Sequence, residues 1–304
     1  MHVPVMLEEA VEVLVHRSDG CYVDGTFGRG GHSAAILDRL SERGRLMVID
    51  KDPEAIAVAQ ARFGHDARVV IKHGSFSNLA AHLQSEGLGL IDGLLLDLGV
   101  SSNQIDVAAR GFSFGREGPL DMRMDNSQGA TAAEWLHAAS EQEMSTVFKQ
   151  YGEERYAKRI ARSIVAARVT APLATTTELA QLIAEASPGA DPHKHPATRV
   201  FQAIRIQVNR ELDDLDHALA MATDQLSLGG RLVVISFHSL EDRKTKRFIK
   251  SQEKNDPFPS KLPVFDHQIK RRVRSLGKWR ASEVEVKRNP RSRSAVMRAM
   301  EKIA

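Results

Sequence analysis

The sequence predicts an α/β protein in which a Rossmann-like domain is interrupted by an inserted, all-helical domain. Short apolar strands alternate with helical segments up to residue 105, no convincing strand follows until residue 196, and a strand pattern then returns. Because alternating strands and helices form right-handed βαβ units, one parallel sheet is expected. The sheet domain is therefore discontinuous, residues 1–105 and 197–304, and residues 106–196 form the inserted helical domain.

Four apolar runs in the first part are expected to be strands. Each run is continuous rather than alternating, which is typical of strands buried on both faces of a sheet. Asp52 and Pro53 then suit the N-cap and first position of a helix. The predicted strands are residues 21–24, 46–50, 68–71 and 93–97, with helices over residues 32–40 and 54–62.

Helix signals dominate the middle of the chain. The capping-box pattern, Ser or Thr followed three residues later by Glu, occurs three times, starting at Thr131, Ser140 and Thr175. Residues 156–168 carry apolar side chains at helical spacing. After it, residues 198–226 predict one or two helices, residues 231–237 a fifth strand, and residues 295–300 a final strand or helix.

Composition limits the class of protein. The 304 residues are 42% hydrophobic and 27% charged, which is typical of a folded globular chain. No apolar run approaches the roughly 18 residues of a membrane span, and no signal-peptide pattern opens the chain. Cys21 is the only cysteine, which excludes an intrachain disulfide and a Cys-based zinc cluster. We expect a cytoplasmic protein without a metal site.

The net charge of +3 hides a strong asymmetry. Residues 243–304 hold 19 Lys/Arg and 6 Asp/Glu, a net charge of +13, so that residues 1–242 carry −10. A basic segment on an acidic body indicates a polyanionic partner, although a solvated surface would show the same pattern. Aromatic residues make up only 5% of the chain, which argues against an extended base-stacking surface.

A glycine-rich turn follows the first predicted strand, with the sequence DGTFGRGGH at residues 24–32. Glycines at this place allow a sharp turn and close approach of a ligand to the backbone, and the next helix begins with its positive dipole end. The spacing differs from the dinucleotide fingerprint, and the acidic residue before the first glycine resembles the first motif of class I methyltransferases. The turn therefore predicts a nucleoside cofactor such as S-adenosylmethionine (AdoMet).

Three further residues are placed to serve this cofactor. Asp50 ends the second predicted strand, where a carboxylate can accept hydrogen bonds from ribose hydroxyls in NAD and AdoMet enzymes alike. Phe76 follows the third strand and could pack on adenine, or on the core. Asp97 ends the fourth strand in the sequence DLGVSS, where amino-methyltransferases carry an Asp, Asn or Ser. A turn or N-cap role is the alternative for Asp97.

Eight segments, in order along the whole chain, resemble the bacterial 16S rRNA (cytosine-N4)-methyltransferase family, the RsmH/MraW type. They are DGTFGRGGH, LLLDLGVSS, RGFSF, GPLDMRMD, YGEERYAKRIAR, KHPATRVFQAIRIQVN, ISFHSLEDR and NPRSRSA. The resemblance implies AdoMet-dependent methylation of the exocyclic N4 of a cytidine in the decoding region of 16S rRNA. It also implies that AdoMet is contacted by Gly30, Gly31, His32, Asp50, Phe76, Asp97 and Gln104.

The expected chemistry needs neither a metal nor a covalent nucleophile, because AdoMet carries the reactive methyl group. Asp97 is the first candidate to accept a hydrogen bond from the cytosine amine, and His238 to take its proton. Candidates to stack on the extruded base are Phe112, Phe114 and Phe237, and for each of them packing in the core is the alternative. Candidates to dock 16S rRNA, within the small ribosomal subunit, are Lys270, Arg271, Arg272 and Arg274.

Two other functions remain compatible with the sequence. One is an NAD-dependent oxidoreductase on a similar fold, which the glycine spacing and the lack of a clear Tyr-x-x-x-Lys element disfavour. The other is an RNA-binding ribosome assembly factor that keeps an AdoMet pocket without catalysis.

Overall fold

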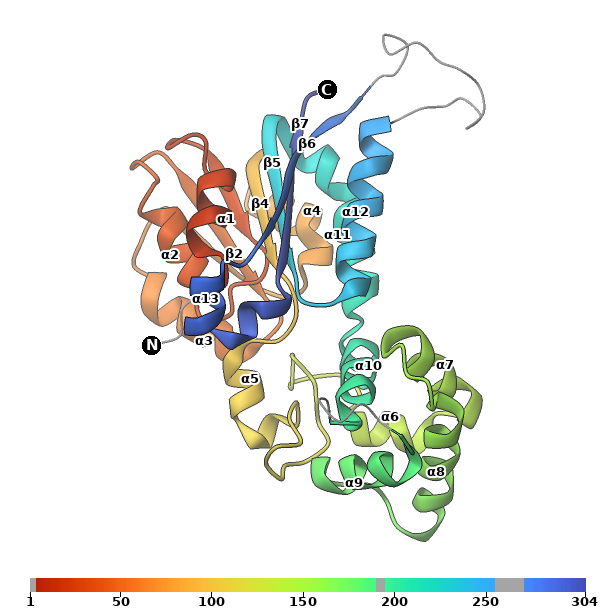
Figure 1. Ribbon diagram of the computed structural model, residues 1–304. Helices are drawn as coiled ribbons and strands as arrows, with labels where there is room; N and C mark the ends of the chain where they lie inside the picture. Colours follow the sequence, from red (N-terminus) through yellow and green to blue (C-terminus); the bar gives the residue numbers. More distant parts are fainter. Residues whose placement is uncertain (1–3, 190–194, 255–270) are drawn as a thin grey trace, which may run out of the picture. The chain divides into compact units, whose positions relative to one another are not determined.

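The computed structural model describes residues 4–189, 195–254 and 271–304, and the chain divides into two compact units (Figure 1). The sheet unit comprises Met1–Gly99 and Leu212–Ala304, and the helical unit comprises Val100–Glu211. The helical unit is wider than the 106–196 segment expected from the sequence. It also includes α5 (Ser102–Asp106) and α10 (Ala197–Asn209), because buried side chains of α10 belong to the core of the helices and not to the sheet.

The sheet unit contains one seven-stranded sheet in the order β3-β2-β1-β4-β5-β7-β6. Neighbouring strands among β1 to β5 pair in parallel, whereas β7 is antiparallel to β5 and to β6. This confirms the predicted Rossmann-like α/β class. The strands are β1 (Cys21–Asp24), β2 (Arg45–Asp50), β3 (Val69–His73), β4 (Ile91–Asp97), β5 (Leu226–Ser236), β6 (Val273–Arg280) and β7 (Val296–Lys302).

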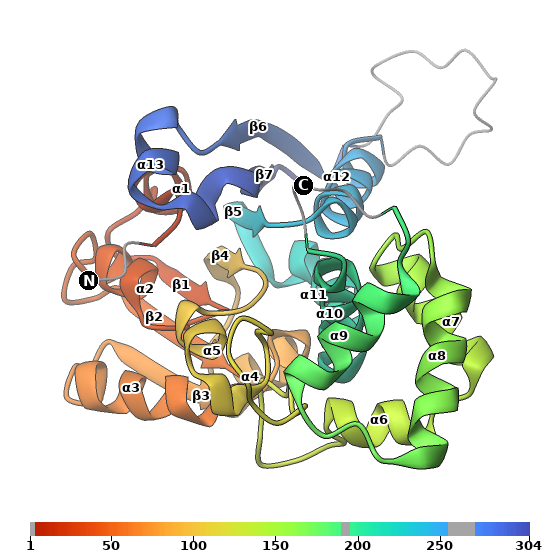
Figure 2. The same cartoon turned by 60° about the horizontal axis from the view of Figure 1, so that its bottom comes forward.

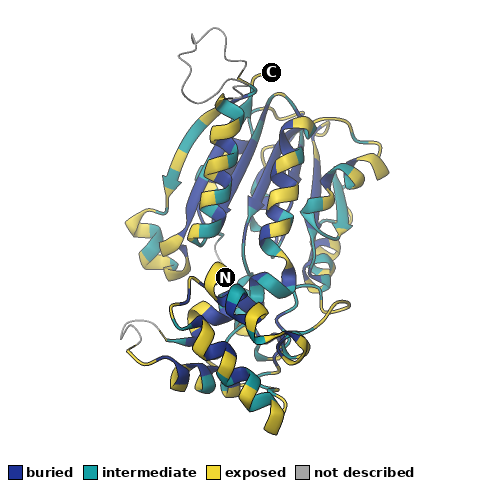
Figure 3. Ribbon diagram, turned by 90° about the vertical axis from the view of Figure 1, so that its right-hand side faces the viewer, coloured by how far each residue is buried: buried dark blue, intermediate teal, exposed yellow. Residues whose placement is uncertain are grey.

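Helices cover both faces of this sheet, as the continuous apolar strands require. Adjacent residues of a strand point to opposite faces. Tyr22 accordingly packs with α1 (Leu7–Leu14), α2 (Gly31–Leu37) and α3 (Pro53–Phe63), and Val23 with the helices of the other face. Those are α4 (Leu79–Ser85), α11 (Glu211–Gln225) and α12 (Ser239–Lys254). Figure 3 shows the buried strands behind helices whose outer faces are exposed.

One edge of the sheet collects the carboxyl ends of the parallel strands, and we call it the carboxyl edge; the opposite one is the amino edge. Asp24 pairs with Leu95 near the end of β4, and Asp97 with Ile235 near the end of β5. The connection from β6 to β7 lies at the carboxyl edge too, because Arg280 at the end of β6 pairs with Val296. That connection contains α13 (Glu283–Arg288) and the 3₁₀ helix η4 (Pro290–Ser294).

The helical unit has its own apolar core, and its described residues between 106 and 196 contain no strand beyond an isolated bridge from Pro119 to Thr175. The side chains of Thr131, Ser140 and Thr175 cap the helices that their sequence pattern predicts. Figure 2 shows these helices from below: α6 (Ala132–Ala138), α7 (Glu141–Tyr151), α8 (Ala157–Thr170), α9 (Thr176–Ala186) and α10.

A buried amide ties the loop before α6 to the end of α10. The Asn209 side chain accepts a hydrogen bond from the Met124 N–H at 2.6 Å and donates to the carbonyls of Met122 at 2.7 Å and Arg205 at 2.9 Å. Met122 has a left-handed backbone, φ 60°, which costs free energy in a residue with a side chain. The hydrogen bonds of Asn209 to Met122 and Met124 hold the loop in this conformation.

Candidate functional site

The carboxyl edge brings together three aspartates that end neighbouring strands. Asp24 ends β1, Asp50 ends β2 and Asp97 ends β4. Ligands of open α/β sheets bind outside the carboxyl ends of the strands, where the strand order reverses. In this sheet β1 lies between β2 and β4, so the strand order reverses at β1. One of the three aspartates ends β1, and the other two end its neighbouring strands.

The glycine turn between β1 and α2 is packed too closely for side chains. A Cβ on Gly30 would lie 2.5 Å from the Phe27 ring, and a Cβ on Gly31 would lie 2.1 Å from Cγ of Pro4. Gly30 also has φ 73°, a left-handed conformation that favours glycine. The turn therefore requires glycine at both positions, because neighbouring protein atoms fill the space that a side chain would need.

Asp24 serves the turn itself. One carboxylate oxygen accepts from the hydroxyl of Ser33 at 2.6 Å, and the other accepts from the N–H of Thr26 at 3.1 Å. Burial raises the pKa of Asp24 to about 6, against the lowering effect of these two hydrogen bonds. The acidic residue before the first glycine thus joins the end of β1 to α2.

Asp50 holds the glycine turn from the next strand. Its two carboxylate oxygens accept from the N–H of Gly28 at 2.7 Å and from the N–H of Asp52 at 2.8 Å. Burial raises its pKa to about 6. Because each carboxylate oxygen has more than one acceptor site, both can still accept a hydroxyl of a ligand.

Asp97 differs from the other two carboxyl groups in its lack of partners. Its Oδ1 is buried and has no hydrogen-bond partner among the described residues. Burial, together with the negative charges of Asp24 and Glu241, raises its pKa well above the usual value. An unsatisfied buried carboxylate is costly for a fold, and such groups concentrate at functional sites.

His32 lies at the start of α2 and is almost fully buried. Its Nε2 is 3.2 Å from the carbonyl oxygen of Val5, and its Nδ1 is 3.7 Å from Oδ2 of Asp97, beyond hydrogen-bond distance. Burial lowers the pKa of His32 to about 4, so the ring is neutral near pH 7. It donates to Val5 and leaves the Nδ1 side toward Asp97 without a proton.

Phe237 and His238 follow β5 at the same edge, over a buried glutamate. The N–H groups of Phe237 and His238 donate to Oε2 of Glu241 at 2.8 and 3.2 Å. The imidazole Nε2 is 3.1 Å from the other oxygen, Oε1. Glu241 is 2% exposed and fixes the backbone at Phe237 and His238, whereas neither ring nitrogen of His238 has a hydrogen-bond partner among the described residues.

The remaining predicted cofactor residues lie in two places. Phe76 begins the 3₁₀ helix η1 (Phe76–Asn78) after β3, and its Cβ lies close to Gly25, where an added Cβ would be 3.0 Å away. Gln104 lies in the helical unit, in a capping box at the start of α5. Its side-chain oxygen accepts from the N–H of Ser101 at 2.9 Å.

Two predicted base-stacking residues also belong to the helical unit. The Phe114 ring packs against His195, with 4.5 Å between ring centroids, and edge-on against Phe201, with 4.9 Å. Phe112 is partly buried, and the guanidinium of Arg110 lies 6.0 Å from its ring centroid. Core packing accounts for Phe114 in particular.

The predicted RNA-docking residues lie at the amino end of β6. Lys270 is outside the described residues, and Arg271 is exposed. Arg272 forms an ion pair with Asp224, and Arg274 pairs with Glu301 at 2.8 Å. Two of the four positive charges are thus offset by carboxylates of the same unit.

Comparison with known proteins identifies the family of this chain. Residues 1–303 match the family described as the MraW methylase family. The chain belongs to the MraW methylase family. A curated relative from Chromohalobacter salexigens, "Ribosomal RNA small subunit methyltransferase H", is 55% identical over 305 residues, which cover 99% of this chain and 92% of that protein. The resemblance read from the sequence motifs is confirmed.

Two solved structures resemble this MraW-family chain more remotely. A candidate rRNA methylase from Clostridium thermocellum is 12% identical and has a TM-score of 0.48, with 100% of both chains covered. An rRNA methylase from Streptococcus thermophilus is also 12% identical and has a TM-score of 0.43, with 98% of this chain and 93% of that chain covered.

Three residues of the MraW-family site were not among those predicted. Glu241 is the glutamate of the HSLED segment at residues 238–242, but the sequence around it does not show that its side chain is buried next to His238. Pro4 and Val5 contact Gly31 and His32 across the chain, and no local pattern signals such a contact. These residues could be found only from the folded chain.

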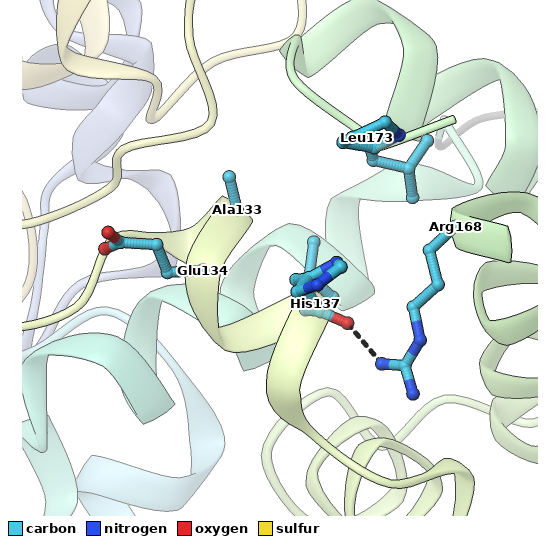
Figure 4. A pocket seen from close by; sticks show the side chains of 7 residues that line it. Ala133, Glu134, His137, Arg168 and Leu173 are labelled. Atoms are coloured by element: carbon cyan, nitrogen blue, oxygen red, sulfur yellow. Dashed lines mark hydrogen bonds between the residues drawn. The ribbon is translucent and has the colours of Figure 1, made fainter. Parts of the chain in front are cut away.

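Elsewhere, a pocket of about 280 Å³ opens in the helical unit (Figure 4). Arg168 reaches across it and donates to the carbonyls of Leu136 at 2.6 Å and Ala139 at 2.7 Å. The pocket contains none of the predicted site residues; it is lined by Ala133, Glu134, Leu136, His137, Arg168, Pro172 and Leu173.

The described residues contain no group of three or more His, Cys, Asp or Glu side chains that could hold a metal ion. In the same part of the chain, no helix combines the length and apolar character needed to cross a membrane.

Proposed function

We propose that the sheet unit binds AdoMet at the carboxyl edge and that the enzyme methylates the exocyclic N4 of a cytidine in the decoding region of 16S rRNA. The observation that carries the proposal is the unpartnered, buried Oδ1 of Asp97 beside the glycine turn, in a chain of the MraW methylase family. Membership of a methylase family leaves no support for the NAD-dependent alternative.

The residues at the carboxyl edge fit AdoMet. Gly30 and Gly31 leave backbone where side chains would clash, and Asp50 keeps acceptor capacity for ribose hydroxyls. Phe76 is half-buried at the rim after β3, where its ring can pack on adenine. His32 lies at the start of α2, next to Gly31. Gln104 belongs to the helical unit, and its contact with AdoMet stays a prediction from the sequence resemblance. When bound, AdoMet supplies an electrophilic methyl group on a positively charged sulfonium sulfur.

In this proposal Asp97 activates the cytosine amine. The lone pair of the N4 amine is delocalised into the ring, which makes it a weak nucleophile. A carboxylate that accepts an N–H hydrogen bond draws the amine toward a pyramidal shape and directs its lone pair at the methyl carbon. If Asp97 instead contacts AdoMet, the backbone carbonyls of Leu98 and Gly99, next along the chain, take over this role.

In this proposal His238 removes the proton that the methylated amine must lose. Its Nδ1 is buried and has no hydrogen-bond partner among the described residues, and its Nε2 faces the buried Glu241. A carboxylate next to an imidazole stabilises the imidazolium that forms when the ring accepts a proton. Phe237, the preceding residue, is our first choice to stack on the extruded base, because Phe114 is used in the helical core.

Mass spectrometry tests this function directly. Small ribosomal subunits isolated from cells that lack the modification are incubated with the enzyme and AdoMet, and the rRNA is digested to nucleosides. We expect N4-methylcytidine from the wild type, and none from Asp97→Ala with unchanged RNA affinity. An unmethylated product from the wild type refutes the function, whereas full turnover by Asp97→Ala refutes only the role of this residue.

A further inference from the structure

The two ends of strand β6 carry positive charge in different surroundings. Val273 at the start of β6 pairs with Lys302, at the amino edge of the sheet. Arg280 at its end pairs with Val296, which in turn pairs with Ser236 at the carboxyl end of β5. Six residues separate Arg274 from Arg280, about 20 Å along a strand. At physiological salt this exceeds the Debye length of about 8 Å, so the two groups of charges act separately.

At the amino edge, the positive charges are largely used within the fold. Arg272 pairs with Asp224, and Arg274 pairs with Glu301. Glu301 also accepts from Arg231 at 3.2 Å, in a three-residue network that joins β5, β6 and β7. Breaking these partly exposed pairs would cost only about 0–1 kcal/mol each, but the carboxylates next to the arginines would then repel an approaching phosphate.

At the carboxyl edge, the connection from β6 to β7 exposes a second set of basic residues, which we call the edge cluster. It consists of Arg280, Lys287, Arg288, Arg291 and Arg293, all exposed. Within the described residues, no ion pair or hydrogen bond of the side chain is found for Arg280, Lys287, Arg288 or Arg293. Phosphate backbones attract guanidinium and ammonium groups of this kind, and these four side chains are not engaged within the described part of the fold.

The edge cluster is tied to the cofactor turn through the first described residues. Glu285 of α13 accepts from the N–H of Met6 at 2.8 Å. The preceding carbonyl, of Val5, lies 3.2 Å from Nε2 of His32, and Pro4 packs on Gly31. Both views show α13 beside α1 (Figures 1 and 2). One short segment therefore separates the edge cluster from the residues proposed to hold AdoMet.

We propose that the edge cluster is the surface of the sheet unit that binds the phosphate backbone of the RNA substrate, and that the amino end of β6 is not. The inference rests on the proposed function, because it names where that RNA docks. Phosphate contacts of this kind position a substrate without reading its sequence. A polyanion held at the carboxyl edge lies on the same edge as Asp97 and His238, whereas one held by Arg271 lies at the opposite edge.

A charge-reversal triple tests the proposal. The edge variant is K287E/R288E/R293E, and the matched control is R43E/K250E/K254E, whose exposed residues lie toward the amino edge and change the net charge equally. Binding to an RNA duplex of arbitrary sequence is measured between 50 and 200 mM salt. Each lost phosphate contact should lower the slope of log K against log salt by about 0.9, so the edge variant should lose about 2–3 in slope and at least ~10-fold in affinity.

The control should keep most of its RNA affinity. Equal losses in both variants would show a general effect of net charge and overturn the proposal. A third variant, R271Q/R272Q/R274Q, represents the amino end of β6, and a larger loss there than in the edge variant would also overturn it. Binding of the edge cluster to vesicles of phosphatidylglycerol but not to RNA would assign the surface to a membrane instead.

Two readouts separate this inference from the proposed function. AdoMet affinity and thermal unfolding of the edge variant should match the wild type, and the neutral K287Q/R288Q/R293Q replaces it if charge reversal impairs folding. If the wild type forms no N4-methylcytidine, the function fails, and the RNA-binding comparison still decides the surface. If the wild type methylates and the edge variant does so with an unchanged KM, the surface alone is refuted.

Discussion

Replacing Asp97 with asparagine should stabilise the unliganded protein while abolishing methyl transfer. The Asp97 carboxylate has a buried oxygen without a hydrogen-bond partner among the described residues, and the negative charges of Asp24 and Glu241 act on it. Asparagine keeps the shape and removes the charge. Asparagine leaves a neutral polar group in the same place, so the substitution recovers only the extra cost of the buried charge; we expect the free energy of unfolding to rise by about 1–3 kcal/mol at pH 8.

The pH dependence of this gain follows from the raised pKa of Asp97. The folded state binds the proton more tightly than the unfolded state, so the cost of the carboxylate is absent below the unfolded pKa of about 3.8. It grows as the pH rises toward the folded pKa and is constant above it. Urea unfolding at pH 4.5, 6 and 8 should therefore show the smallest gain for Asp97→Asn at pH 4.5 and the largest at pH 8.

Asp92 provides the matched control on the same strand. Its carboxylate accepts from the N–H of Cys21 at 2.9 Å and from the hydroxyl of Ser227 at 3.0 Å, and Arg17 lies 3.5 Å away. Asp92→Asn should lose about 1–2 kcal/mol, because charge-assisted hydrogen bonds are weakened. The reasoning is refuted if Asp97→Asn is no more stable than the wild type at pH 8, or if its gain is the same at all three pH values.

Three further substitutions or titrations test other parts of the structure. Gly31→Ala should lower AdoMet affinity, measured by calorimetry, and should lower the free energy of unfolding by about 1–3 kcal/mol, because its Cβ would lie 2.1 Å from Pro4. The control Gly89→Ala adds a Cβ that meets nothing within 4 Å, so it should leave calorimetry and thermal unfolding unchanged. Asn209→Ala should cost about 2–4 kcal/mol from three lost hydrogen bonds, and intact near-UV circular dichroism and urea midpoint would contradict this. His32 should stay neutral in NMR titrations down to about pH 4, so that its contribution to stability is lost as pH falls from about 6.5 to 4; a midpoint near 6.5 would show that the ring is not buried.

Strand positions and the glycine turn could be read from the sequence because local chemistry determines them. The first four strands are continuous apolar runs that end in Asp or a turn, and they lie within two residues of the predicted bounds. The segment 295–300, which could have been strand or helix, is β7 (Val296–Lys302). The segment is a strand because it pairs with β5 on one side and β6 on the other, and no local sequence pattern shows which strands a segment will pair with.

The sequence was enough to predict where the site residues stand in the strands, but not which hydrogen-bond partners and charges surround them. Asp24, Asp50 and Asp97 all end strands, and the sequence does not show which of them lacks a hydrogen-bond partner. The structure separates them by their partners: two accept backbone or hydroxyl hydrogen bonds, and the third has a buried oxygen with none among the described residues. The excess of positive charge after residue 243 was likewise visible in the sequence. Which of these arginines form ion pairs with carboxylates depends on how the strands and helices pack.

The position of β7 inside the sheet also constrains how the protein is made. Since β7 lies between β5 and β6, the sheet unit cannot close until residue 302 has been synthesised. Asp97 in β4 must meanwhile find Ile235 in β5 across the whole helical unit, a contact of long sequence separation that slows folding. The helical unit is one uninterrupted segment, Val100–Glu211, and can fold before the first four strands have their remaining partners. Until β5 has been synthesised, the edge of β4 that β5 covers in the folded sheet has no partner, and an unpaired edge of this kind can pair with another chain.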